Sequence, residues 1–143
     1  MNRSVLRIVD ANLNRALEGL RAAEDVLRFW CNDRRIVGRL RRTRHALGAL
    51  YAGSRRTLLA ARDSVRDAGR RNPERRYRDV TQMLAANFRR AEESLRVLEE
   101  TAKLANPRLV GALKRLRYTV YDLERRAGGI PLTQPPADKR MVR

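Results

Sequence analysis

With 143 residues, the chain is long enough for one domain with a substantial hydrophobic core and too short for two ordinary domains. Its 33 Lys and Arg against 16 Asp and Glu give a net charge of +17, which favours an anionic partner such as nucleic acid, an anionic membrane surface or a phosphorylated small molecule. The single Cys and single His exclude an intrachain disulfide and a Cys/His metal cluster. No apolar stretch reaches the length of a membrane span or resembles a signal peptide. We therefore expect a cytoplasmic protein with no membrane association.

Strong helix formers dominate the composition, and every predicted element is a helix. The first helix is expected from about Ser4 to Phe29, where apolar residues recur with helical periodicity. Asn32-Asp33 is a capping pair that predicts the start of a second helix, which reaches about Tyr51. The segment RRTLLAA, which follows Gly53 and Ser54, continues this helical pattern.

The second half of the chain follows the same plan. Asn72-Pro73-Glu74 combines a cap, a proline at the first helical position and an acidic first turn, so it predicts the start of a long third helix. Asn106-Pro107 predicts the start of a fourth helix, which Gly128-Gly129 ends. Residues 54–73 form a connector between two helical hairpins, and residues 128–143, with three prolines, are a tail or linker.

An internal repeat relates the two hairpins. The segment Ala11–Glu24 (ANLNRALEGLRAAE) is identical to Ala86–Glu99 (ANFRRAEESLRVLE) at eight positions, and Val37–Leu50 aligns with Val110–Leu123 two residues out of that register. The sequence therefore predicts an all-α fold, a bundle of two helical hairpins related by a pseudo-two-fold axis, with repeats at about 5–51 and 80–126 inside a domain that spans 1–127. We expect the function to lie where the two copies meet.

Six polar side chains fall inside the apolar faces of the predicted helices, in pairs that the repeat relates. They are Asn12 and Asn87, Arg15 and Arg90, and Arg44 and Arg117. A buried guanidinium needs a partner, so one interpretation is that Glu24, Glu99 and Glu124 neutralise these arginines in salt bridges that set the helix register. The other interpretation is a pocket for a polyanion, because four interior cations face only three acids and the planar guanidinium suits phosphate oxygens. Both interpretations stand at this point.

The connector supplies charged residues that have no counterpart in the repeat. They are Arg62, Asp63 and Asp67, with Asp79 nearby. Two Asp four residues apart in a Gly-containing loop can share a Mg²⁺ ion, which keeps several waters and needs only one or two protein carboxylates. A capped, solvated loop is the simpler interpretation of the same spacing. The single His45 is more typical of a packed or surface histidine than of a catalytic base.

Several functional signatures are absent from the sequence. It has no GxxxxGK[ST] phosphate loop, no GxGxxG, no HExxH and no pair of CxxC motifs. Nothing in it resembles an RRM, a KH domain or a paired-cysteine finger. The net charge still allows a basic helical module that binds nucleic acid, and a steep loss of binding with rising salt would be its mark.

Two blocks of the sequence carry a resemblance to a known family. They are DANxNRxxEGLRxxED, from Asp10, and NFxRAxExLRVLEE, from Asn87. With RRTRHAL, AARDSVRDAG and LRYTVYDLE, they make the chain from about Arg7 to Glu124 resemble the compact all-helical hydroxymethylpyrimidine-phosphate kinase of thiamine biosynthesis, a domain often fused ahead of thiamine-phosphate synthase. The resemblance implies an enzyme that transfers the ATP γ-phosphoryl group to hydroxymethylpyrimidine phosphate, with a functional link to thiamine-phosphate synthase. Since only about twenty residues follow Glu124, no synthase barrel is expected here.

The resemblance transfers to individual positions of this chain. Matching residues are Asp10, Asn12, Arg15, Glu18, Gly19, Arg21, Glu24, Arg44, Arg62, Asp63, Asp67, Gly69, Asn87, Arg90, Glu93, Arg96, Glu99, Arg117 and Tyr118. The connector departs from the family at Ala68 and Arg70, where a β-branched residue and a threonine are expected. These departures put the geometry of that loop in question.

These observations lead to one assignment of roles. The catalytic residues are expected to be Arg44, Arg62 and Asp63, and the Mg²⁺ ligands Asp63 and Asp67. Substrate and phosphate binding are assigned to Asn12, Arg15, Asn87, Arg90 and Arg117. The expected reaction uses ATP and Mg²⁺ and depends on positioning and charge neutralisation. The alternatives are the nucleic-acid-binding module and a non-catalytic domain that binds a thiamine intermediate, and assembly into a homo-oligomer stays open.

Overall fold

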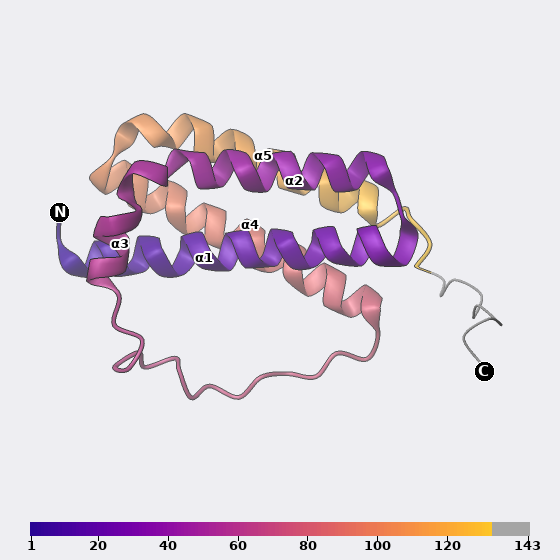
Figure 1. Cartoon of the computed structure of the whole chain (residues 1–143), viewed down its shortest axis with the longest axis horizontal. Helices are drawn as coiled ribbons and strands as arrows, with labels where there is room; N and C mark the ends of the chain where they lie inside the picture. The colour runs from indigo at the N-terminus through magenta and orange to yellow at the C-terminus, as the bar shows by residue number, and fades with distance from the viewer. Residues whose placement is uncertain (133–143) are drawn as a thin grey trace.

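The computed structural model describes residues 1–132 and shows a bundle made of helices (Figure 1). The first hairpin contains α1 (Arg3–Val26), a π-helical turn (Leu27–Cys31) and α2 (Arg34–Leu50); the second contains α4 (Val80–Ala105), a 3₁₀ turn (Pro107–Leu109) and α5 (Val110–Ala127). A 3₁₀ turn (Ala52–Ser54) and the short α3 (Arg55–Ala61) follow α2. The predicted all-α bundle of two hairpins is confirmed. None of the helices in the described part is long and apolar enough to cross a membrane.

Capping residues set the boundaries of the first hairpin. Asn2 caps α1, its side chain accepting a hydrogen bond from the Ser4 N–H at 2.7 Å. At the turn, Asn32 adopts a left-handed conformation with φ 51°, which ends the π-helical turn. The predicted cap at Asp33 is confirmed, because its carboxylate accepts hydrogen bonds from the N–H groups of Arg35 and Ile36.

The start of the third long helix differs from the prediction at Asn72-Pro73-Glu74. The helix α4 begins only at Val80, and residues 62–79 contain turns and irregular chain. Asp79 is the actual cap, with its side chain accepting from the Gln82 N–H at 2.8 Å while Gln82 accepts from the Arg78 N–H at 2.7 Å. The segment before Asp79 has no apolar stripe to bury, and helices in proteins owe most of their stability to such burial.

The first and third long helices, α1 and α4, make the most extensive contact in the bundle. Small residues allow the close approach: a Cβ added to Gly19 would lie 2.8 Å from the Asn87 carbonyl oxygen. Ala91 faces the same point, and Phe88 and Leu20 fill the core beside it. Helix α2 packs on α1 and α5 on α4, and α2 and α5 also touch. The connector runs along the side of α1 and α4 rather than that of α2 and α5 (Figure 1).

Equivalent side chains of the two hairpins make equivalent contacts. Asn12 donates to the Ile8 carbonyl and Asn87 to the Met83 carbonyl, each at 2.9 Å and four residues back along its helix. Arg44 pairs with Glu24, and Arg117 with Glu99. These matched contacts support the repeat inferred from the sequence. The predicted tail, residues 128–143, lies outside the described residues beyond Leu132.

Candidate functional site

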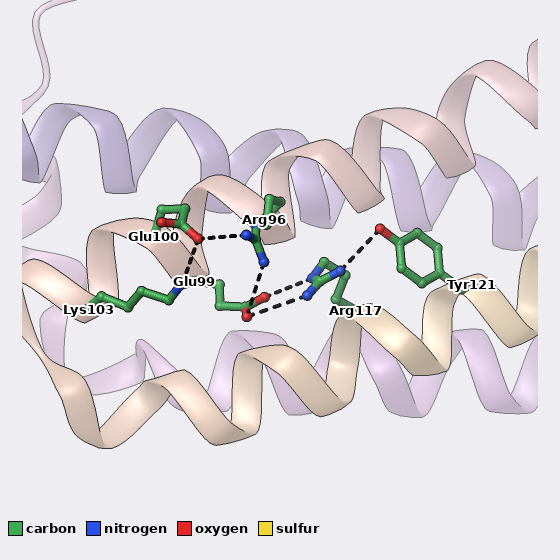
Figure 2. Close-up of polar contacts among 6 residues, drawn as sticks. All are labelled: Arg96, Glu99, Glu100, Lys103, Arg117 and Tyr121. Atoms are coloured by element: carbon green, nitrogen blue, oxygen red, sulfur yellow. Dashed lines mark hydrogen bonds and ion pairs between the residues drawn. The ribbon is translucent and has the colours of Figure 1, made fainter.

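Two of the four predicted interior arginines are held in salt bridges. Arg117 donates to Glu99 at 2.8 Å and 3.4 Å, and its Nη1 donates to the Tyr121 hydroxyl at 3.3 Å (Figure 2). The hydrogen bond that Arg117 donates to Glu99 is the main cause of the raised pKa of Arg117. Arg44 donates to Glu24 at 3.0 Å, and both glutamates are buried. The salt-bridge interpretation thus describes Arg44 and Arg117, whose carboxylate partners lie within the bundle.

The other two arginines, Arg15 and Arg90, are not in the interior. Both side chains are exposed, which corrects the prediction, whereas Asn12 and Asn87 beside them are buried as predicted. The helix axes approach so closely at Gly19 that no long side chain fits between them, and an arginine at the edge of the contact extends its guanidinium into solvent.

The third predicted partner acid, Glu124, lies beside another carboxylate. Burial and hydrogen bonding to Glu124 raise the pKa of Glu92 to about 8, with Arg89 opposing the shift. The expectation that Glu124 neutralises an interior arginine is therefore wrong, because within residues 1–132 it forms no ion pair and faces Glu92 across α4 and α5. Burial and a neighbouring carboxylate both disfavour the ionised form of Glu92, so it keeps its proton to a higher pH than an exposed glutamate does.

A polar cleft of about 500 Å³ lies between the first half of α1 and the chain that follows α3. Its central feature is a bidentate pair in which Arg62 donates to both oxygens of Asp10, at 2.7 Å and 2.9 Å. The Asp10 side chain is only 9% exposed, so this pair anchors the connector to α1. Arg7 adds a second link by donating to the Asp63 carbonyl at 3.2 Å. Asp63, Ser64 and Asp67 form the connector wall of the cleft.

A second cleft of about 520 Å³ lies between α1 and α4. It contains Arg15 and Arg90, which the repeat relates, together with Arg89 and Glu93. In the part of the chain that the structure describes, none of these three arginines forms an ion pair with a carboxylate. Asn12 and Arg15 line both clefts, so the two form one continuous polar surface. Guanidinium groups without protein partners are suited to bind phosphate.

Among the described residues, the connector carboxylates do not form a metal cage made by protein alone. Asp63 accepts from the Arg66 N–H at 3.2 Å and Asp67 from the Gly69 N–H at 2.8 Å, in each case with Oδ1. These contacts match the capped-loop interpretation, and each leaves the second oxygen without a partner among the described residues. Residues 1–132 contain no group of three or more His, Cys, Asp or Glu that could hold an ion. Mg²⁺ bound through phosphates requires fewer protein ligands.

The site assigned from the sequence lacks several charged residues of this surface. Asp10 and Arg7 lie in the first cleft, and Arg89 lies in the second. Asp10 carried a usable signal, because the equivalent position in the second repeat is Ala85, and an acid in only one of two copies indicates a copy-specific partner. Arg44 and His45 line a different hollow, and Asn87 and Arg117 line neither polar cleft.

Within residues 1–132, these features define a small all-helical domain in which cations without an ion-pair partner and the connector carboxylates line one continuous polar surface of a duplicated bundle. The chain belongs to the ThiD2 family, whose profile matches residues 7–126. It is 42% identical over 134 residues to a Synechocystis protein named thiamine-phosphate synthase, a match that covers 92% of this chain and 38% of the relative. Proteins of that name from Gloeobacter violaceus and Rhodopirellula baltica are 42% and 36% identical, over 87% and 90% of this chain and 37% and 36% of their own lengths.

The chain thus spans little more than a third of the length of these relatives. No solved structure matches it.

Proposed function

We propose that this chain is a phosphotransferase of thiamine biosynthesis, which converts hydroxymethylpyrimidine phosphate to the diphosphate at the expense of ATP. The family match and the relatives named thiamine-phosphate synthase support the pathway. The observation that carries the reaction class is the continuous polar surface around Asn12 and Arg15, where exposed arginines lie beside the carboxylates of the connector. This combination suits phosphoryl transfer, which needs positioning and charge neutralisation more than covalent chemistry.

The residues of the two clefts have distinct roles in this proposal. Arg15 and Arg90 bind phosphate oxygens, and Arg89 adds positive charge beside them. Asp10 holds the Arg62 guanidinium at the mouth of the first cleft, so Arg62 acts on the phosphates in a preset orientation. The amide of Asn12 already donates to the Ile8 carbonyl, which leaves its oxygen to accept from an amino group of the substrate.

In the reaction, the bond between the γ-phosphorus and its bridging oxygen breaks while a phosphate oxygen of the acceptor bonds to that phosphorus. ADP leaves with the bridging oxygen, and the acceptor becomes a diphosphate. A phosphate monoester is already an anionic nucleophile, so the site needs no dedicated general base. Asp63 and Asp67 would hold Mg²⁺, which neutralises charge that develops on the transferring group.

The test compares two exposed arginines of matched chemistry. Arg15→Met removes a cleft guanidinium that has no ion pair within residues 1–132, and Arg108→Met removes an exposed one outside both clefts. We expect both variants to unfold within about 0.5 kcal/mol of the wild type. In an ADP-release assay with hydroxymethylpyrimidine phosphate, Arg15→Met should lose roughly 100-fold or more in kcat/KM and Arg108→Met should not. Equal activity of the two variants would remove Arg15 from the site, and a wild type without turnover would overturn the proposed function.

The exposed connector arginines favour a second candidate, a module that binds nucleic acid. Arg71, Arg75 and Arg76 are all exposed and lie outside both clefts. Affinity for a nucleic acid that falls steeply with salt, in a wild type without transferase activity, would support this candidate. Saturable binding of the pyrimidine phosphate without ADP release would instead indicate a non-catalytic binding domain.

A further inference from the structure

A third hollow, between α1 and α2, belongs to neither polar cleft. It is an open groove of about 870 Å³, a volume in the range of small-molecule sites. Its apolar floor contains Leu17 and Ala22 from α1 and Gly48 and Ala49 from α2. Arg44 and His45 line the same groove.

The equivalent place in the second hairpin is filled by two aromatic rings. The alignment of the repeats places Tyr118 at the position of His45 and Tyr121 at that of Gly48. The two tyrosine rings meet edge to face, with centroids 5.7 Å apart. The Arg117 guanidinium carbon lies 5.1 Å from the centroid of one ring and 5.6 Å from that of the other. In the second hairpin, the guanidinium of Arg117 is thus covered by aromatic rings, one of which carries a hydroxyl that accepts its hydrogen bond.

In the first hairpin, no described aromatic residue covers the corresponding guanidinium, that of Arg44. Arg44 bonds to Glu24 through Nε, and no described residue accepts a hydrogen bond from its terminal nitrogens. Arg117 uses those nitrogens for Glu99 and for the Tyr121 hydroxyl. Accordingly, the Arg44 side chain is 18% exposed, twice the 9% of Arg117.

We propose that this groove binds a planar nitrogen heterocycle, which stacks near the Arg44 guanidinium. The heterocycle accepts a hydrogen bond from Arg44, as the Tyr121 hydroxyl accepts one from Arg117 in the second hairpin. Guanidinium groups stack on aromatic faces and donate in their own plane, so one residue can provide both contacts. The proposal rests on the proposed function, whose two substrates each carry such a ring. The ring comes either from the nucleotide base or from the aminopyrimidine of the acceptor.

The position of the groove along α1 is consistent with a phosphorylated heterocycle. Asn14 and Arg15 line the polar cleft, and Leu17 and Glu18 line the groove, so successive stretches of one helix serve the two sites. A ligand with a ring at one end and phosphates at the other can reach both.

The test fills the groove with the side chain that the second repeat uses. Gly48→Tyr introduces the ring of Tyr121, and Gly53→Tyr introduces the same ring outside the groove; a Cβ at either glycine meets nothing within 4 Å. Both proteins should therefore fold, which circular dichroism and a melting curve would check. Calorimetric titration then measures the binding of ADP and, separately, of hydroxymethylpyrimidine phosphate.

We expect Gly48→Tyr to weaken one of these ligands by at least about ten-fold, a loss of roughly 1.4 kcal/mol, while Gly53→Tyr binds both like the wild type. The ligand that loses affinity identifies the source of the ring. Unchanged affinity of Gly48→Tyr for both ligands would overturn the inference, even if the wild type transfers phosphate. A wild type that shows the ten-fold difference without turnover would keep the groove as a binding site and overturn the proposed function. A wild type that binds neither ligand would overturn both.

Discussion

At the scale of single residues, the arginines of this protein differ in their binding partners. Arg44 and Arg117 form ion pairs with buried glutamates, whereas Arg15 and Arg90 extend into a cleft. The sequence placed all four on apolar faces, and their different surroundings decide their chemistry. All three nitrogens of Arg117 bond to protein groups, so this residue serves the fold. Arg15, Arg90 and the terminal nitrogens of Arg44 have no hydrogen-bond acceptor among the described residues, so they can bind a ligand.

The buried pair Arg117–Glu99 provides a test of this division. Arg117→Met leaves the buried Glu99 carboxylate with Arg96, at 3.5 Å, as its ion-pair partner and removes its shorter bond to Arg117, so we expect unfolding to become easier by about 1.5–3 kcal/mol (Figure 2). Adding Glu99→Gln removes the charge that has lost its main partner and should recover part of that loss. Urea denaturation of the two single variants and the double variant measures the coupling. Independent, additive losses would show that the pair contributes nothing to stability as a pair.

At the scale of elements, the contact of α1 with α4 depends on Gly19. A methyl group there would lie 2.8 Å from the Asn87 carbonyl oxygen, and backbone cannot move aside as a flexible side chain can. We expect Gly19→Ala to destabilise the protein by about 1–3 kcal/mol and to lower the proposed activity, since this contact also sets Arg15 against Arg90. Gly48→Ala, where nothing lies within 4 Å, should instead stabilise by up to about 1 kcal/mol. Thermal melts of the two variants with opposite signs would confirm that Gly19 is required by packing.

The contact of α4 with α5 contains the carboxyl pair Glu92 and Glu124 and predicts a dependence on pH. The pKa of Glu92 rises from 4.5 to about 8, so between these values the folded protein holds a proton that the unfolded chain has released. The contribution of Glu92 to the free energy of unfolding is therefore greatest at low pH and falls as the pH rises from about 4.5 to about 8. Melting temperatures of wild type and Glu92→Gln from pH 5 to 9 measure the effect.

We expect the difference between these two proteins to change steadily in favour of Glu92→Gln as pH rises. The exposed Glu74→Gln serves as the control and should follow the wild type. A constant difference between Glu92→Gln and wild type across the range would show that Glu92 does not titrate as described.

At the scale of the whole molecule, the two repeats differ most at the connector, which in the described part of the chain contacts only the first copy of the polar positions. Each hairpin supplies an asparagine and an arginine near the contact of α1 with α4, but only one copy has Asp10, Arg62 and the loop carboxylates beside them. The polar surface is therefore asymmetric although the scaffold is a duplication. An asymmetric site suits a reaction between two different phosphorylated substrates.

The far part of the connector should not be needed for the proposed reaction. Residues 71–77 are exposed and line neither polar cleft, so replacing them with a Gly/Ser segment of equal length should change stability by less than about 1 kcal/mol. The replacement lowers the net charge by two. We expect ADP release to persist and any salt-sensitive binding of nucleic acid to weaken, as a filter-binding assay would show. Loss of turnover in a folded variant would extend the site along the connector.

Local patterns in the sequence predicted the long helices and the cap at Asp33, and they indicated the duplication of this protein. Asp33, the helical turn after Asn106-Pro107 and the apolar stripes could be interpreted without a structure, because capping bonds and helical periodicity connect residues a few positions apart. Interior positions were also predicted correctly for Asn12, Asn87 and Arg117. The false helix start at Asn72 had the right local cues, but no core packs against that segment.

Only the tertiary structure decided which polar residues meet. The bond between Asp10 and Arg62 joins positions 52 residues apart, and the pairing of Glu92 with Glu124 depends on how α4 lies on α5. Whether Arg15 points inward or into a cleft depends on the distance between two helix axes, which Gly19 sets and no helical periodicity encodes. The same applies to the groove beside Arg44, since a missing side chain becomes a cavity only when the surrounding helices are fixed in place.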